Sequence, residues 1–252
     1  MTLQPSQPSL QSPLKLSVVI CAHNEQDWIA RTLESLWSQK RLPDELIVVN
    51  NVSTDSTERI VQRFMGAHPE WRIMLVNQPR KGLHHAREAG WRATSGDIVV
   101  MTDADVTFPV DWLANIEAAF ADSTVDALTG CVRFDDALPI INWATWACDQ
   151  VYQPERIGRM VTKSYLLFGN NSAYRRHVLE TVGGYANKPP DLLEDVFISK
   201  RVQDAHFKIK FLRHNKIWHT FRRYSKEGVR GYLKYLFFFS PENVYADHLS
   251  DV

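Results

Sequence analysis

The stretch Ile98-Val99-Val100-Met101-Thr102-Asp103-Ala104-Asp105 decides which fold and which chemistry this sequence predicts. Its apolar residues are typical of a buried strand, which we place over 97–102. Two carboxylates follow at once, on Asp103 and Asp105. Carboxylates spaced in this way can hold Mg²⁺ or Mn²⁺ from one side and leave positions open for substrate phosphates. A solvated turn is an equal alternative for the tripeptide alone, so the interpretation depends on which other residues reach this point.

Upstream of this stretch, apolar strands alternate with amphipathic helices. We expect strands over 16–21, 45–49, 71–76 and 97–102. We expect helices after an N-cap at Asn24, after a capping box of Asp55 and Glu58, over 83–93, and from Pro109 to Phe120. This order predicts parallel strands with helices on both faces of the sheet. In such sheets, ligands bind at the carboxyl ends of the strands.

Polar and charged residues crowd these four strand ends. They are Ala22, His23, Asn24 and Glu25 at the first end, Asn50 and Asn51 at the second, Arg80, Lys81 and Gly82 at the third, and Asp103, Ala104 and Asp105 at the fourth. Arg87 lies in the helix after the third end, where it could hold a diphosphate together with Lys81 and the helix N-terminus. A solvated basic helix face is the alternative. The carboxylates across the sheet edge favour phosphate binding.

The second half of the sequence is less regular. We expect a strand over 125–134, a helix over 140–152, an extended segment over 166–174, a helix over 193–202 and a strand over 207–212. Trp143 and Trp146 lie three residues apart in the first of these helices. Helical core packing is the default for such a pair, and stacking against a sugar ring is the alternative.

Two further positions could complete a catalytic site. Glu194 and Asp195 open the helix over 193–202, where a carboxylate is more often a partner of the helix dipole than a general base. His219 ends another short strand. A histidine in that setting is usually structural. It becomes a third metal ligand only if its strand end reaches Asp103 and Asp105.

Composition and charge narrow the class of protein. Of the 252 residues 44% are apolar, and 29 basic residues balance 29 acidic ones, so nothing predicts nucleic-acid binding. Three cysteines without metal-site spacing favour a reducing compartment. No apolar run approaches the ~20 residues of a membrane span. Residues 1–13 lack the pattern of a secretion signal. We therefore expect a cytoplasmic protein.

The C-terminal segment over 221–252 is basic and aromatic. Lys226, Arg230 and Lys234 form one helical stripe beside an apolar one that leads into Phe237-Phe238-Phe239. This pattern predicts a helix lying in the membrane surface, at the inner face of the cytoplasmic membrane. A helix docked on the core and a homodimer interface are equal alternatives.

Together these motifs resemble glycosyltransferase family 2, the inverting nucleotide-sugar enzymes of the GT-A fold. The resemblance runs from about Leu16 to His219. Its motifs are the segments 17–25, 50–55, 82–87, 103–105, 168–171, 183–185 and 194–195. It implies a Rossmann-like, mainly parallel α/β sheet flanked by helices, followed by an acceptor-side second half. Accordingly we expect a disordered tail over 1–13, a GT-A domain over 14–220 (a nucleotide-sugar half over 14–107 and an acceptor half over 108–220) and an amphipathic tail over 221–252.

The resemblance also implies a mechanism. A nucleoside-diphosphate sugar would bind at the residues of the four strand ends together with Asp55 and Arg87. Asp103 and Asp105 would hold Mn²⁺ or Mg²⁺, with His219 as a third ligand if its strand end reaches them. Glu194 and Asp195 match the catalytic pair, of which Asp195 would serve as the base for the hydroxyl of a glycan or a lipid-linked acceptor.

Two positions depart from the family pattern. Asn50 replaces an acidic residue that contacts the nucleotide base, and an amide brings no charge. Val52 replaces a common glycine. A UDP-sugar is favoured as donor, with a GDP-sugar as the alternative. A non-catalytic nucleotide-sugar binding protein remains open, as does a sugar-1-phosphate nucleotidyltransferase, although the first strand is not followed by the glycine-rich loop that the latter needs.

Overall fold

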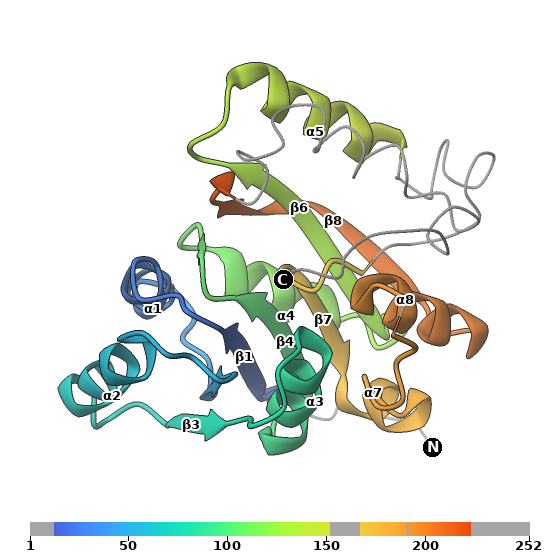
Figure 1. Ribbon diagram of the computed structural model, residues 1–252. Coiled ribbons are helices and arrows are strands. Elements are labelled where there is room, and N and C mark those ends of the chain that lie inside the picture. Colours follow the sequence, from blue (N-terminus) through green and yellow to red (C-terminus); the bar gives the residue numbers. More distant parts are fainter. Residues whose placement is uncertain (1–12, 152–166, 191, 223–252) are drawn as a thin grey trace, which may run out of the picture.

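A single mixed sheet carries the structure, a computed structural model that describes residues 13–151, 167–190 and 192–222 (Figure 1). Its strand order is β3-β2-β1-β4-β7-β6-β8-β5. The strands are β1 (Leu16–Ala22), β2 (Glu45–Asn50), β3 (Ile73–Asn77), β4 (Ile98–Asp103), β5 (Val106–Thr107), β6 (Ala127–Phe134), β7 (Ser172–Arg175) and β8 (Ile209–His219). The predicted tails over 1–13 and 221–252 lie outside the described residues, except for residues 13, 221 and 222.

The first four strands form the predicted parallel half. β1 pairs in parallel with β2 and with β4, and β2 pairs in parallel with β3. The register places Ala22 opposite Asn50 and Cys21 opposite Asp103. The carboxyl ends of β1, β2 and β4 therefore lie level with one another, which confirms that their polar residues share one edge.

The remaining strands complete the sheet in a mixed pattern. β7 runs antiparallel to both β4 and β6, and β6 runs parallel to β8. The short strand β5 pairs antiparallel with the end of β8, so that Val106 lies opposite His219. This pairing brings the last residue of β8 to the segment that follows β4. Figure 1 shows the long strands β6 and β8 side by side.

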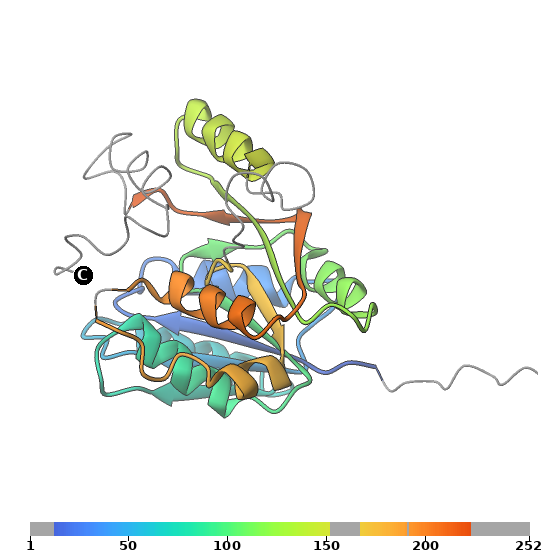
Figure 2. The same ribbon diagram turned by 90° about the vertical axis from the view of Figure 1, so that its right-hand side faces the viewer.

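Helices cover both faces of the sheet, as the sequence predicts (Figure 2). They are α1 (Ile29–Trp37), α2 (Thr57–Ala67), α3 (Leu83–Ala93), α4 (Trp112–Phe120), α5 (Pro139–Val151), α7 (Arg176–Val182) and α8 (Glu194–Asp204). Alternate residues of β1 enter different cores. Val18 and Ile20 pack with residues of α1, α2 and α4, whereas Val19 and Cys21 pack with residues of α3, α7 and α8. Strands buried on both faces explain the continuous apolar runs in the sequence.

Several predicted boundaries are wrong for local reasons. Asn24 does not cap a helix: its φ is 55°, its Oδ1 accepts the N–H of Thr54, and α1 begins only at Ile29. The capping box does not form, because Glu58 accepts a hydrogen bond from the Asn50 amide instead of reaching back to Asp55. α4 begins at Trp112, three residues after Pro109. The two short strands expected over 207–212 and at His219 are one strand, β8.

Two features outside these boundaries also differ from the prediction. Helix α7 was not expected at all. Trp143 and Trp146 of α5 do not pack in the core, since 62% and 49% of their surfaces are exposed. Among the described residues, no helix combines the length and the apolar character that crossing a bilayer requires.

Candidate functional site

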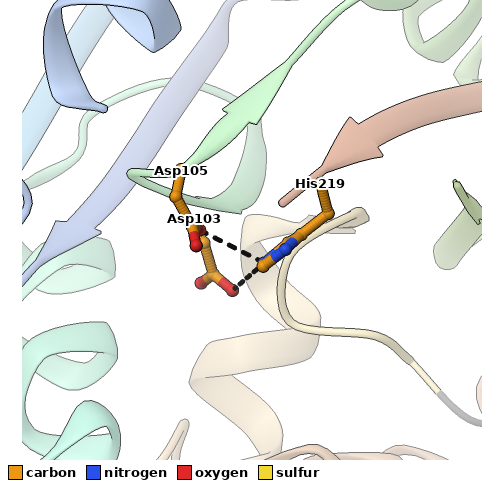
Figure 3. A group of neighbouring side chains, drawn as sticks. All are labelled: Asp103, Asp105 and His219. Atoms are coloured by element: carbon orange, nitrogen blue, oxygen red, sulfur yellow. Dashed lines mark ion pairs between the residues drawn. The ribbon is translucent and has the colours of Figure 1, made fainter. Parts of the chain in front are cut away.

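Asp103, Asp105 and His219 converge at the carboxyl end of β4. Asp103 ends β4, Asp105 follows two residues later, and the β5–β8 pairing delivers His219. The His219 Nε2 atom lies 3.2 Å from Asp105 Oδ1 and 3.9 Å from Asp103 Oδ2. One ligand atom from each residue lies within 4.8 Å of the other two. Figure 3 shows the three side chains pointing toward one another from two separate parts of the chain.

The electrostatics of this triad suit a cation. Although burial opposes it, the hydrogen bond to Asp105 raises the pKa of His219 to about 9. Burial acts to raise the pKa of Asp105, but the hydrogen bond and charge of His219, together with Arg222 and Thr220, lower it. Burial raises the pKa of Asp103. Two carboxylates and one imidazole form a mixed oxygen and nitrogen donor set, which fits Mn²⁺ and, less closely, Mg²⁺.

A second layer of side chains holds Asp105 from behind. Thr220 Oγ1 donates to Asp105 Oδ2 over 3.1 Å, and Arg222 Nη2 donates to the same oxygen over 3.2 Å. Arg222 also pairs with both carboxylate oxygens of Glu25. Burial and the nearby charge of Asp105 raise the pKa of Glu25 to about 7, although Arg222 opposes this rise. The side chain of Glu25 therefore joins the Asp103–Asp105–His219 triad through Arg222.

Arg87 connects the triad with the predicted catalytic pair. Its guanidinium lies 3.5 Å from Asp103 Oδ1, 3.6 Å from Glu194 Oε1 and in direct contact with Asp195 Oδ1. Only 3% of its side chain is exposed. In the described structure Arg87 thus faces three carboxylates in the interior, and its expected contact with a diphosphate stays a prediction.

Gly169 makes room for this buried arginine. A Cβ atom on Gly169 would lie 2.0 Å from Cζ of Arg87, so no larger residue fits without moving the guanidinium. The backbone of Gly169 also hydrogen-bonds to Asp195. Burial raises the pKa of Asp195 to about 6, while the positive charge of Arg87 opposes the rise. A carboxylate with such a pKa accepts a proton readily near neutral pH.

Asparagine amides brace the strand ends on the nucleotide side. Asn50 Nδ2 donates to Asn77 Oδ1 over 2.9 Å and to Glu58 Oε2 over 3.2 Å, and Asn50 Oδ1 accepts the N–H of Ser53. An aspartate could not make the two donated bonds, which explains why an amide stands at position 50. Val52 adopts a φ of 59°, the left-handed conformation that glycine adopts most readily.

The other residues of this edge hold loops together. Asn51 donates to the backbone carbonyls of Gln78 and Arg80 and accepts from the N–H of Gly82. His23 Nδ1 lies 2.7 Å from the carbonyl of Asn51. Asp55 accepts the N–H groups of Gln26 and Thr57. Lys81 is exposed.

The structure therefore brings together Asp103, Asp105, His219, Glu25, Arg87, Glu194 and Asp195. Sequence reasoning missed Gly169 as the support of Arg87, and it assigned Arg222 to the C-terminal tail. A signal for Arg222 was present, since it follows His219 by three residues.

Comparison with known proteins identifies the family of this chain. The family model described as Glycosyl transferase family 2 matches residues 17–183. A probable glycosyltransferase of Bacillus subtilis, YdaM, is 30% identical over 211 residues, which cover 78% of this chain and 48% of that protein. Beta-monoglucosyldiacylglycerol synthase of Synechocystis is 26% identical over 242 residues, which cover 88% of this chain and 49% of that protein. The chain thus spans about half the length of these two relatives.

Solved structures give the same result for the fold. The mannosyltransferase PcManGT from Pyrobaculum calidifontis, solved in complex with GDP-Man and Mn²⁺, matches with a TM-score of 0.67 and 25% sequence identity. The match covers 92% of this chain and 63% of that one. The family model and the shared architecture together establish that this chain is a member of glycosyltransferase family 2 with a GT-A fold.

Proposed function

We propose that this chain transfers a sugar from a nucleoside-diphosphate sugar to an acceptor hydroxyl with inversion at the anomeric carbon. The observation that carries the proposal is the continuous chain of charged contacts from the Asp103–Asp105–His219 triad through Arg87 to Asp195. The triad would serve the donor, and Asp195 would serve the acceptor. Family membership supports the reaction class.

On the donor side, Asp103, Asp105 and His219 would hold a divalent metal. When bound, the metal supplies positive charge that neutralises the leaving diphosphate. His219 must lose its proton to act as a ligand, and its position between two carboxylates fixes which nitrogen faces them. The asparagine-braced loops after β1, β2 and β3 would form the wall that receives the nucleoside.

On the acceptor side, Asp195 would remove the proton of the attacking hydroxyl. It lies in the first turn of α8, and both Arg87 and the backbone of Gly169 fix the orientation of its carboxylate. A fixed base avoids the reorganisation that a mobile one would require at each turnover. Glu194, also near Arg87, adds negative charge beside Asp195.

For the donor and for the acceptor, two candidate classes each are proposed. We favour a UDP-sugar as donor with a GDP-sugar as the alternative, and the GDP-Man complex of PcManGT adds weight to the latter. For the acceptor we favour a glycan or a lipid-linked acceptor, and one relative named as a beta-monoglucosyldiacylglycerol synthase supports the lipid. Binding of residues 221–252 to a membrane surface would fit a lipid acceptor.

The decisive experiment replaces the base. Asp195→Asn should lower transfer by roughly 10²–10⁴-fold, because general-base assistance contributes about that much. Nucleotide release from UDP- and GDP-sugars, measured with Mn²⁺ and a panel of acceptors, would report the loss. Binding of UDP or GDP should be unchanged, since Asp195 serves the acceptor.

Asp204→Asn is the matched control, because Asp204 is an exposed carboxylate at the other end of the same helix. It should retain full activity. Normal turnover by Asp195→Asn would refute the assignment of the base. A wild-type protein that binds nucleotide sugars without releasing nucleotide would instead be a binding module.

A further inference from the structure

The carboxylate of Glu25 and the guanidinium of Arg222 form an ion pair directly against the proposed metal site. Arg222 contacts both oxygens of Glu25 and lies 3.2 Å from Asp105 Oδ2. These residues come from opposite ends of the described chain: Glu25 follows β1, and Arg222 follows β8. The contact therefore joins two segments that are remote in sequence.

The two carboxylate oxygens of Asp105 contact different residues. Oδ2 accepts from Thr220 and Arg222, whereas Oδ1 faces His219 Nε2. Arg222 thus holds the oxygen that is not part of the triad, and it can stay in place when the other oxygen binds a metal. Its Cζ also lies 5.8 Å from the centroid of the Trp28 ring, which gives the guanidinium a second support.

A cation in this place would normally weaken a metal site. A guanidinium this close to Asp105 repels a divalent ion, and the interaction is strong because Asp105 is largely buried. The carboxylate of Glu25 compensates for that repulsion. At the same time 39% of the Arg222 side chain is exposed, so its charge can reach an anionic ligand at the metal.

We propose that the Glu25–Arg222 pair is a built-in counter-ion device that sets the metal affinity of the site and supplies a cationic contact for the diphosphate of the donor. Arg222 would give the diphosphate a cationic contact more exposed than Arg87, which the sequence pattern favours for that role. Glu25 is the positioning residue that keeps Arg222 beside Asp105. The inference rests on the proposed metal-dependent donor site and names the group that links metal binding to diphosphate binding there.

The test uses two substitutions with opposite expected effects. Mn²⁺ binding is measured by calorimetry at pH 8 without nucleotide. Arg222→Ala leaves Glu25 uncompensated beside Asp105 and should tighten Mn²⁺ binding roughly 10-fold. Glu25→Gln removes the carboxylate that offsets the charge of Arg222 beside Asp105 and should weaken Mn²⁺ binding by a similar factor. The double variant Glu25→Gln with Arg222→Ala restores the local charge balance and should bind Mn²⁺ nearly as the wild type does.

Nucleotide binding gives a second readout. With saturating Mn²⁺, Arg222→Ala should bind UDP and GDP roughly 10-fold more weakly, whereas Arg222→Lys should retain most of the affinity. Lys40→Ala removes one positive charge from an exposed ion pair with Asp111, beyond the far end of α1, and should change neither Mn²⁺ nor nucleotide binding.

The proposal is overturned if Arg222→Ala weakens Mn²⁺ binding, or if Glu25→Gln and Arg222→Ala change it in the same direction. A purely structural pair would produce that second result. The thermal midpoints of both variants show whether each is folded. Metal binding is measured without turnover, so a protein that behaves as expected here yet transfers no sugar would refute the proposed function and leave this inference standing.

Discussion

Arg87 and Arg222 both bridge carboxylates at the proposed metal site, but they do so in different surroundings. Arg87 lies under Gly169 with 3% of its side chain exposed, between Asp103 and Asp195. Arg222 lies at the rim with 39% exposed, between Glu25 and Asp105. The buried guanidinium of Arg87 contacts carboxylates on both sides and can hold them in place. The exposed guanidinium of Arg222 can also meet a ligand that arrives from solvent.

The two arginines should also differ in how much they contribute to the stability of the fold. Replacing Arg87 strands carboxylates in the interior, whereas replacing Arg222 leaves its partners nearer to water. Breaking a buried ion pair costs far more than breaking an exposed one, because an uncompensated buried charge remains. The two arginines should therefore differ most in what their loss does to folding.

The largest expected effect follows from this difference. Arg87→Met should lower the free energy of unfolding by about 3–5 kcal/mol, the usual cost of breaking a buried charge pair. Arg222→Ala should cost about 1 kcal/mol or less. Urea denaturation followed by circular dichroism measures both. Equal losses in the two variants would mean that burial does not distinguish the two arginines.

Gly169→Ala tests the buried side of the comparison without removing any charge. The new methyl group would lie 2.0 Å from the Arg87 guanidinium and push it away from Asp195. Overpacking of this kind typically costs about 1–3 kcal/mol. Transfer activity should fall about 100-fold, because a displaced base loses its alignment. Nucleotide release and urea denaturation report the two effects.

Gly66→Ala is the matched control, since a Cβ at Gly66 in α2 meets no atom within 4 Å. It should stabilise the protein by about 0.5–1 kcal/mol, the helix preference of alanine over glycine, and leave activity unchanged. Full activity in Gly169→Ala would contradict a positioning role for Arg87.

The sequence predicts the parallel half of this fold well and the contacts of the second half poorly. Strands β1, β2 and β4 are buried on both faces, so their apolar runs are continuous and local pattern suffices to find them, whereas the edge strand β3 is only partly buried. β7 and β8 depend on pairing with distant strands. Short-range pattern carries no information about the β5–β8 pairing, which is what delivers His219 to Asp105.

The candidate site divides in the same way. Asp103 and Asp105 follow a recognisable strand, and Glu194 with Asp195 begins a recognisable helix. The burial of Arg87 could not be predicted, because it depends on Gly169, which is 82 residues further along the chain. Arg222 was hidden by a boundary drawn at 220. In both cases the residue that contacts the arginine is remote in sequence. The local sequence around an arginine is the same whether its side chain faces solvent or a buried carboxylate.

The smallest expected effect is a pH dependence of activity. It distinguishes ionisation of Asp195, the partner of Arg87, from ionisation of Glu25, the partner of Arg222. As a general base, Asp195 must be deprotonated, and burial raises its pKa to about 6. At saturating Mn²⁺, kcat/KM should therefore level off above pH 7 and fall about tenfold per pH unit below pH 6 as Asp195 takes up a proton.

Glu25, with a pKa of about 7, is the other residue whose protonation could cause this acid limb of the pH profile. Glu25→Gln should keep the acid limb near pH 6, because Arg87, Glu194 and the surrounding burial set the pKa of Asp195. If the acid limb disappears in Glu25→Gln, the ionisation belongs to Glu25 and not to Asp195.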